Sequence, residues 1–254
     1  MIELATTDQC ACSSTDRALA SGAKGYGFES RQARFSNGGD MSFLNQKIKN
    51  DLAESFKNLK QNVILKFFTQ DMECRFCKET RELLEELPGV SDKVKVEIYD
   101  FVKDAALAKE LGISRIPAIA VTGEKDYGIR FYGIPSGYEF TSLVEAIRLV
   151  ANAEVKLTQE SKAFLDGLTS DVHLQVFVTP TCPYCPPAVI LAQQMAYYSP
   201  RVKSDMIEAT EFPQLAQKYN VYGVPRTMIN ESEFIEGAVP ENQLIEKIRS
   251  VLKK

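Results

Sequence analysis

Two pairs of cysteines carry the chemistry that this sequence could perform. Cys74 and Cys77 are separated by two residues, and Cys182 and Cys185 repeat that spacing 108 residues later. Each pair follows a short apolar segment and precedes a predicted helix. A thiol just before a helix lies near unpaired backbone N–H groups and the positive end of the helix dipole, and both favour the thiolate. Each pair is therefore predicted to be a redox-active dithiol.

The order of the cysteines predicts their roles. We expect Cys74 and Cys182, just before their helices, to be the attacking thiols. Cys77 and Cys185 are expected one turn along the same helices, where they could close a disulfide and release a bound partner. They are the predicted resolving thiols.

Three prolines surround the second pair. Pro183 suits a first helical position, because its missing N–H would have no partner there. Pro186 and Pro187 would remove donors as the helical hydrogen bonds begin, which predicts a slightly bent first turn.

A second repeat supports the first. Ile116-Pro117 and Val224-Pro225 lie at the same 108-residue offset as the cysteine pairs. Two copies of a dithiol in register with a downstream proline are more specific than a single pair, because each copy could assemble one site.

The elements that must position these residues also occur twice. In the first copy we predict helices over 44–59, 75–87, 104–111 and 139–152 and strands over 63–69, 93–99, 118–121 and 129–132. In the second copy we predict helices over 159–168, 183–197, 211–219 and 241–252 and strands over 173–179, 202–208, 226–230 and 234–236. Strands joined through helices imply parallel pairing, and the short hairpin in each copy adds antiparallel strands at one edge.

The chain divides into three segments. Residues 1–40 are rich in Ser, Gly, Ala and Thr without periodicity, which predicts a disordered tail. Residues 41–152 form the first predicted domain and residues 153–254 the second.

Composition narrows the class of protein. The chain has 254 residues, 44% hydrophobic and 25% charged, with a formal net charge of −4. Its basic residues are scattered and form no cluster, which argues against nucleic acid as a partner. It has no apolar run of 18 residues and no apolar leader, which predicts no membrane association and a cytoplasmic location.

The order of elements resembles the thioredoxin fold, and its doubling resembles the tandem, glutaredoxin-like protein disulfide oxidoreductases. The Cys-Pro-Tyr-Cys motif at 182–185 is typical of glutaredoxins, and residues 133–143 are similar to a segment in the amino-terminal domain of the alkyl hydroperoxide reductase flavoprotein. The resemblance covers residues 41–254. It implies an α/β fold of two tandem thioredoxin-like domains, each a central mixed sheet flanked by helices, with redox-active disulfides and no cofactor or metal.

The resemblance also implies how substrates bind. Both prolines would be cis, so that the preceding residue shows its backbone to the dithiol, and a substrate strand could pair there with little sequence preference. The predicted substrate-binding residues are Ile116, Pro117, Val224, Pro225, Tyr184 and Phe76.

Two departures limit the resemblance. Phe68 and Val176 occupy the position of the buried Asp of thioredoxins, so proton transfer must use another group or water. Residues 236–239 lack the Gly-Gly and Asp with which glutaredoxins hold glutathione, which argues against glutathione as the main reductant.

These features lead to three functional interpretations. The first is a protein disulfide oxidoreductase that reduces, forms or isomerises protein disulfides, served by an NAD(P)H-dependent flavoprotein reductase. The second is an electron carrier between a flavin-dependent reductase and a peroxiredoxin; without a Gly-rich dinucleotide motif, any flavin would be held elsewhere. The third is a non-catalytic or zinc-binding tandem domain, which the wide spacing between the pairs disfavours.

Local charge predicts a division of labour between the two dithiols. Arg75 favours the Cys74 thiolate, but Asp71 and Glu73 offset it. Residues 172–193 carry no Asp, Glu, Lys or Arg, and His173 adds a charge only when it is protonated. We therefore expect the second dithiol to carry the larger share of protein disulfide reduction. His173, at the start of a predicted strand, is expected to have a structural role. Cys10 and Cys12, in the tail, are interpreted as bystanders.

Overall fold

The computed structural model describes residues 43–71 and 74–253. Its helices are α1 (Gln46–Phe56), α2 (Cys77–Glu85), α3 (Ala105–Glu110), α4 (Glu139–Asn152), α5 (Gln159–Asp166), α6 (Cys185–Tyr198), α7 (Pro213–Lys218) and α8 (Glu241–Leu252). Its strands are β1 (Val63–Thr69), β2 (Val94–Asp100), β3 (Ala118–Thr122), β4 (Asp126–Tyr132), β5 (Val172–Val178), β6 (Val202–Glu208), β7 (Arg226–Ile229) and β8 (Glu233–Glu236). The tail at 1–40, with Cys10 and Cys12, lies outside the described residues, as does Glu73.

The same strand pairing occurs in both halves of the chain. In the first half β1 pairs in parallel with β2 and antiparallel with β3, and β3 continues antiparallel to β4. In the second half β5 pairs in parallel with β6 and antiparallel with β7, and β7 continues antiparallel to β8. The predicted mixed sheets with a hairpin are confirmed.

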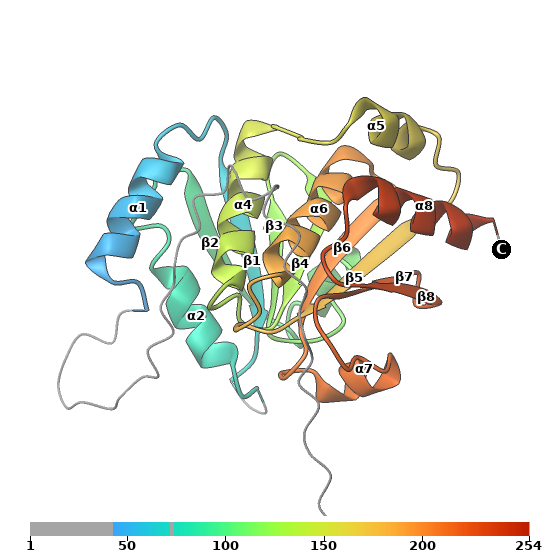
Figure 1. Cartoon of the computed structure of the whole chain (residues 1–254). Coiled ribbons are helices and arrows are strands. Elements are labelled where there is room, and N and C mark those ends of the chain that lie inside the picture. The colour runs from blue at the N-terminus through green and yellow to red at the C-terminus, as the bar shows by residue number, and fades with distance from the viewer. Residues whose placement is uncertain (1–42, 72–73, 254) are drawn as a thin grey trace, which may run out of the picture.

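The two halves share one sheet. β4 pairs in parallel with β6, from Ile129 beside Ser204 to Tyr132 beside Ile207, and this pairing joins both sets of strands. The sheet has eight strands in the order β2-β1-β3-β4-β6-β5-β7-β8 (Figure 1). The hairpin of the first half therefore lies inside the sheet, whereas the sequence placed it at an edge.

Two layers of helices cover the sheet. One core contains buried residues of α1, α2, α4, α6 and α8 and runs through both halves, from Leu44 to Ile248. A smaller core on the other side holds Ala108 of α3 and Tyr219 beside α7. Figure 1 shows α4 and α6 lying next to each other over the middle of the sheet.

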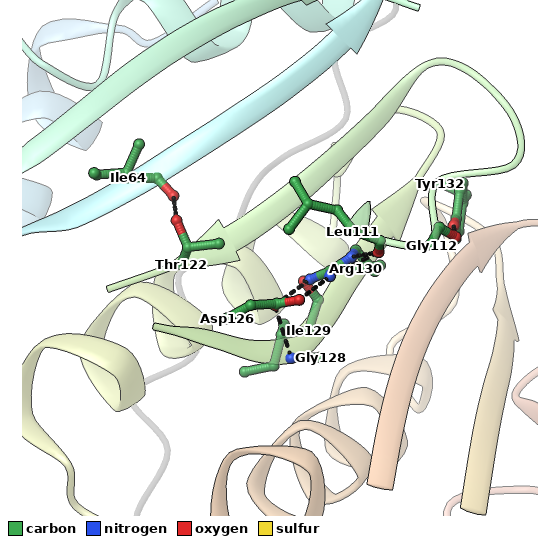
Figure 2. A network of polar contacts seen from close by, with 9 residues as sticks. All are labelled: Ile64, Leu111, Gly112, Thr122, Asp126, Gly128, Ile129, Arg130 and Tyr132. Atoms are coloured by element: carbon green, nitrogen blue, oxygen red, sulfur yellow. Dashed lines mark hydrogen bonds and ion pairs between the residues drawn. The ribbon is translucent and has the colours of Figure 1, made fainter. Parts of the chain in front are cut away.

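A buried arginine lies near the junction between the halves. Arg130 of β4 is 4% exposed, and its guanidinium donates to the Leu111 carbonyl at 2.8 Å and to Asp126 Oδ1 at 2.8 Å (Figure 2). Burial by itself raises the pKa of Asp126, but the hydrogen bonds and charge of Arg130 outweigh it and hold the pKa below its usual value. The pair is therefore charged at neutral pH.

The start of α6 differs from the prediction. The helix begins at Cys185, with Tyr184 as its N-cap residue, so Pro183 precedes the helix and is not its first residue. Pro186 and Pro187 consequently fall within the first turn, where the backbone N–H groups have no helical partner. Pro186 and Pro187 therefore remove none of the backbone hydrogen bonds of α6, whereas the sequence-based expectation of a bent first turn assumed that they would.

Among the described residues, no helix is both long enough and apolar enough to cross a membrane.

Candidate active site

The second dithiol is formed by the turn between β5 and α6. Cys182 lies in the turn and is partly exposed, whereas Cys185 is the first residue of α6 and is buried. Cys185 N donates to the Cys182 carbonyl at 3.4 Å, which folds the turn back on itself. The resolving thiol was expected one turn along the helix. It lies instead at the N-terminus of α6, while the attacking thiol lies outside the helix.

The proline loop lies against this dithiol. The Val224–Pro225 peptide bond is cis, as the resemblance implied, and Cys182 Sγ lies 3.6 Å from the Val224 carbonyl oxygen. The two predicted partners, Cys182 and Val224, are therefore brought together. Pro225 is buried behind them, and Tyr184 is 70% exposed beside the turn. Tyr222, which was not predicted, is 90% exposed two residues before Val224.

The two thiols of this pair have different environments. Burial is the main reason that the pKa of Cys185 lies well above its usual value, followed by its hydrogen bond with Cys182. The negative charge of Glu139 acts in the same direction. Cys185 is therefore a protonated thiol at neutral pH, and it must lose its proton before it can attack a disulfide.

Glu139 supplies a carboxyl group at this site. It is the first residue of α4 and 1% exposed, and it accepts a hydrogen bond from Ser142 Oγ at 2.7 Å through Oε2. Its Oε1 is buried and has no hydrogen-bond partner. Burial raises the pKa of Glu139 to about 7, although the bond from Ser142 opposes this. Such a carboxyl can accept and return a proton near neutral pH.

A short segment of the first half holds Glu139 in place. Tyr138 N donates to the Pro180 carbonyl at 2.9 Å, two residues before Cys182. Gly137 has φ 60°, and a Cβ there would lie 2.2 Å from the Pro180 oxygen. Only glycine fits so close an approach with a left-handed backbone. Sequence reasoning missed Glu139, although it lies in the 133–143 segment on which part of the resemblance depends.

The first cysteine pair lies in the corresponding turn, between β1 and α2, and differs from the second pair in being oxidised. Cys74 and Cys77 form a disulfide with a Cα–Cα distance of 5.4 Å, and Cys77 begins α2. Thr80 Oγ1 and Thr80 N both donate to the Phe76 carbonyl, at 2.7 and 3.0 Å, and so fix the first turn. Phe76 is half-buried, with the Arg75 guanidinium 5.1 Å from its ring centre. Ile116–Pro117 is a second cis peptide bond, again as the resemblance implied.

The remaining sequence candidates lie away from both dithiols. His173 is the second residue of β5, whereas Cys182 follows the other end of that strand. Its Nε2 lies 2.6 Å from Asp205 Oδ2, and its backbone N–H donates to Asn230 Oδ1 at 2.7 Å. These contacts fit the structural role that was expected for it. Among residues 43–71 and 74–253, no cluster of three or more His, Cys, Asp or Glu side chains could hold a metal ion.

The chain has a tandem thioredoxin fold that carries two Cys-x-x-Cys pairs, and it is similar to known disulfide oxidoreductases. Residues 172–250 match the family model of the thioredoxin domain. A protein disulfide oxidoreductase from Aeropyrum pernix K1 is 29% identical, with a TM-score of 0.77 over 82% of this chain and 94% of its own. The NTD_N/C domain of alkylhydroperoxide reductase AhpF from Enterococcus faecalis is 25% identical, with a TM-score of 0.76 over 81% of this chain and all of its own.

The curated relatives are longer proteins. The alkyl hydroperoxide reductase AhpF of Staphylococcus aureus is 28% identical over 209 residues, which cover 82% of this chain and 38% of the relative. An NADH dehydrogenase of Bacillus subtilis is 26% identical over the same shares of the two chains. The chain thus spans less than two-fifths of the length of these relatives.

Proposed function

We propose that the protein is a dithiol–disulfide oxidoreductase acting on protein disulfides through both Cys-x-x-Cys sites, with cytoplasmic proteins as substrates. The observation that carries this proposal is the geometry at Cys182. Cys182 is partly exposed, its sulfur lies 3.6 Å from the carbonyl oxygen of Val224 in the cis-proline loop, and the buried thiol of Cys185 is three residues away. This arrangement allows Cys182 to react with a substrate first and leaves Cys185 to resolve the mixed disulfide afterwards.

The reaction divides into two exchanges. The Cys182 thiolate attacks one sulfur of a substrate disulfide, which forms a mixed disulfide and releases the first substrate thiolate. Cys185 then gives its proton to the Glu139 carboxylate and attacks Cys182, which releases the second thiolate. The dithiol loses two electrons and the substrate disulfide gains them.

Substrate binding would use the surface around Cys182. The backbone of Val224 could pair with an extended substrate segment, a mode of recognition that depends on main-chain atoms. Tyr184 and Tyr222 are exposed and adjoin Cys182 and Val224 in sequence, so their rings could cover apolar parts of the substrate. In the first site Ile116, Pro117 and Phe76 would have the equivalent roles.

Insulin reduction with dithiothreitol, beside a zinc-binding assay, tests the proposal. Cys182→Ser is expected to abolish exchange at the second site, whereas Cys185→Ser is expected to accumulate mixed disulfides, because only the latter keeps the attacking thiol. Undiminished turnover by both variants would contradict the assigned roles. Zinc binding without turnover would favour the non-catalytic alternative.

We further propose that the second dithiol carries the larger share of the activity. The flanking residues at 172–193 bring no fixed charge close to Cys182 in sequence, but Glu139, from the first half, adds a titratable carboxyl that the sequence argument did not include. The Cys74→Ser/Cys77→Ser protein should retain most insulin reduction, and the Cys182→Ser/Cys185→Ser protein should lose most of it. The reverse ranking would show that the first dithiol dominates.

A second candidate function follows from the longer relatives. The similarity to alkyl hydroperoxide reductase AhpF favours an electron carrier between a flavoprotein reductase and a peroxiredoxin. In that case NAD(P)H and a flavoprotein would reduce the second dithiol faster than dithiothreitol does, and an oxidised peroxiredoxin would replace insulin as the preferred substrate. Comparing the two reductants on one preparation separates the candidates.

A further inference from the structure

Three carboxyl groups from both halves lie near one another, and one of them, Glu79, is on the helix that Cys77 begins. Glu79 lies in the first turn of α2, Glu208 ends β6, and Glu211 precedes α7. Each has one buried carboxylate oxygen without a hydrogen-bond partner: Glu79 Oε2, Glu208 Oε1 and Glu211 Oε2. Glu208 itself is 1% exposed. Buried carboxylate oxygens without partners are costly, so their retention at one place calls for an explanation.

The other oxygens fix the orientation of these groups. Glu208 Oε2 accepts from Thr210 Oγ1 at 2.7 Å and from Glu211 N at 2.6 Å. Glu211 Oε1 accepts from Ile134 N at 2.7 Å, which ties the second half to the segment after β4. The Glu211 side chain therefore points back from α7 toward the first half of the chain.

Glu211 lies against the proline loop of the first site. Gly133 N donates to the Pro117 carbonyl at 3.0 Å, directly after the cis bond. A Cβ on Gly133 would lie 3.0 Å from both Cδ and Oε1 of Glu211, so the carboxyl packs on the Gly133 backbone. Glu79, two residues after Cys77, is close enough for its charge to act on Glu211. Glu211 thus lies close both to the residue that bonds the Pro117 loop and to a side chain of the helix that Cys77 begins.

The electrostatics of Glu211 suit proton exchange. Burial raises its pKa to about 7, the hydrogen bond from Ile134 lowers it, and the charges of Glu208 and Glu79 raise it again. The basic groups on the neighbouring loops are Arg115 and Arg75. Arg115 lies 5.2 Å over the Tyr132 ring and Arg75 5.1 Å over the Phe76 ring.

We propose that Glu211, paired with Glu79, is the proton acceptor of the first dithiol. This inference rests on the proposed function, because it assumes that Cys74 and Cys77 exchange disulfides. Under this proposal each half of the chain supplies the carboxyl group that serves the dithiol of the other half. Glu139 of the first half serves Cys185 of the second, and Glu211 of the second half serves Cys77 of the first.

Protons and electrons balance in this step. After Cys74 has formed a mixed disulfide, the proton of the Cys77 thiol passes to the Glu79–Glu211 pair. The Cys77 thiolate then attacks Cys74, a new S–S bond forms, and the bond from Cys74 to the substrate sulfur breaks. The substrate leaves as a thiolate with the electron pair, and the proton held on the carboxyl pair later returns to solvent or to the leaving thiolate.

The experiment uses the full chain with Cys10, Cys12, Cys182 and Cys185 each replaced by Ser, so that only the first dithiol reacts. The reduced protein is mixed with dithiobis(nitrobenzoate) in a stopped-flow instrument. The first coloured thiolate reports the attack by Cys74 and the second reports resolution by Cys77. Adding Glu211→Gln should slow the second phase at pH 7 by about tenfold or more, as expected for loss of a general base. The first phase should not be slowed.

The pH profile separates a proton acceptor from a merely structural residue. Hydroxide replaces the missing acceptor as pH rises, so the deficit of the Glu211→Gln protein should shrink steadily from pH 7 to about pH 9. Glu211→Asp, which keeps a carboxyl, should fall between the parent and Glu211→Gln. Glu82→Gln, on the exposed side of α2 in an ion pair with Lys78, is the matched control and should match the parent.

Each remaining outcome is decisive. If the parent releases no second thiolate, the first dithiol is not redox-competent, and both the proposed two-site function and this inference fail. If the parent reacts in two phases and Glu211→Gln has the same profile, or is slowed equally at every pH, only this inference fails. Should Glu211→Gln not fold, Glu79→Gln tests the same pair, and an unchanged second phase would overturn the proposal.

Discussion

At the scale of single residues, the cysteines and prolines were predictable and the carboxyl groups were not. Cys182 and Val224 repeat the spacing of their counterparts in the first half, so a one-dimensional pattern finds them. Glu139 and Glu211 have no such pattern, because each approaches a dithiol from the opposite half. For Glu139 a signal existed, since it lies in the 133–143 segment that resembles another tandem thioredoxin-fold protein.

Burial makes Glu139 costly for the folded protein. A carboxyl whose pKa is about 7 in the folded state and near 4.5 when unfolded favours folding only while it is protonated. Its contribution is fully present below the unfolded pKa and is lost as pH rises through about 7. Such a cost at neutral pH is expected for a group retained for chemistry.

Glu139→Gln should therefore stabilise the protein at high pH while reducing turnover. We expect a gain of about 1–3 kcal/mol in the free energy of unfolding at pH 8 and almost none at pH 5, because glutamine carries no charge to bury. Urea unfolding at the two pH values measures it. Glu145→Gln, in the same helix and ion-paired with Arg148, is the control and should shift neither value by much. If Glu139→Gln changed the free energy of unfolding equally at pH 5 and pH 8, the change could not be due to burial of a carboxylate charge.

At the scale of elements, the sequence predicted which segments form helices and strands but not where the helices of the dithiols begin. β1, α4, β6 and α8 agree with the predictions. α2 and α6 begin at Cys77 and Cys185, two residues later than predicted, because the first turn after each strand is not helical. The hydrophobic periodicity of a helix does not show at which residue the helix begins when the preceding turn has a similar composition.

The connection between β4 and α4 links both sites. Gly133 at one end bonds to the Pro117 carbonyl of the first site, and Tyr138 at the other bonds to the Pro180 carbonyl beside the second. The position of Glu139 relative to Cys185 therefore depends on the close approach of Gly137 to Pro180.

Gly137→Ala should damage the second site selectively. The new Cβ would collide with the Pro180 oxygen, so the connection must move and carry Glu139 with it. We expect insulin reduction by the Cys74→Ser/Cys77→Ser protein to fall by about tenfold or more, consistent with misplacement of a general base. Gly112→Ala is the matched control: Gly112 also has positive φ, 68°, but a Cβ there would come no closer than 3.8 Å to a neighbouring atom, Lys203 Nζ. If both variants lose activity equally, backbone strain is responsible and not the contact with Pro180.

At the scale of the whole molecule, two repeats were predictable but their fusion into one sheet was not. Each repeat satisfies the pairing rules by itself, and no local pattern in β4 or β6 says that these strands will pair. β6 is nonetheless buried along most of its length, including Ser204 and Asp205, as expected for a strand with neighbours on both sides. The first core continues across this junction, so packing as well as hydrogen bonding joins the halves.

This continuity predicts that the two halves unfold together. Cys77 and Cys185 are buried reporters, one in each half, and in the reduced protein their alkylation during short pulses measures unfolding at increasing urea concentration. Their midpoints should coincide, because exposing either half would open the β4–β6 pairing and the shared core. Two separate midpoints would contradict a single cooperative unit.

A substitution in the first half tests the same coupling more sharply. Asp126→Asn leaves the buried Arg130 without its ionic partner and should lower the free energy of unfolding by about 1–3 kcal/mol at pH 7. This loss is smaller than that expected for a fully buried ion pair, because Asp126 is partly exposed. The pKa of Asp126 is held below its usual value, so this loss should disappear as pH falls through that pKa. The substitution should move the Cys77 and Cys185 midpoints equally, whereas Asp171→Asn, in an exposed pair with Arg201, should move neither. A shift confined to Cys77 would show that the halves unfold independently despite their common sheet.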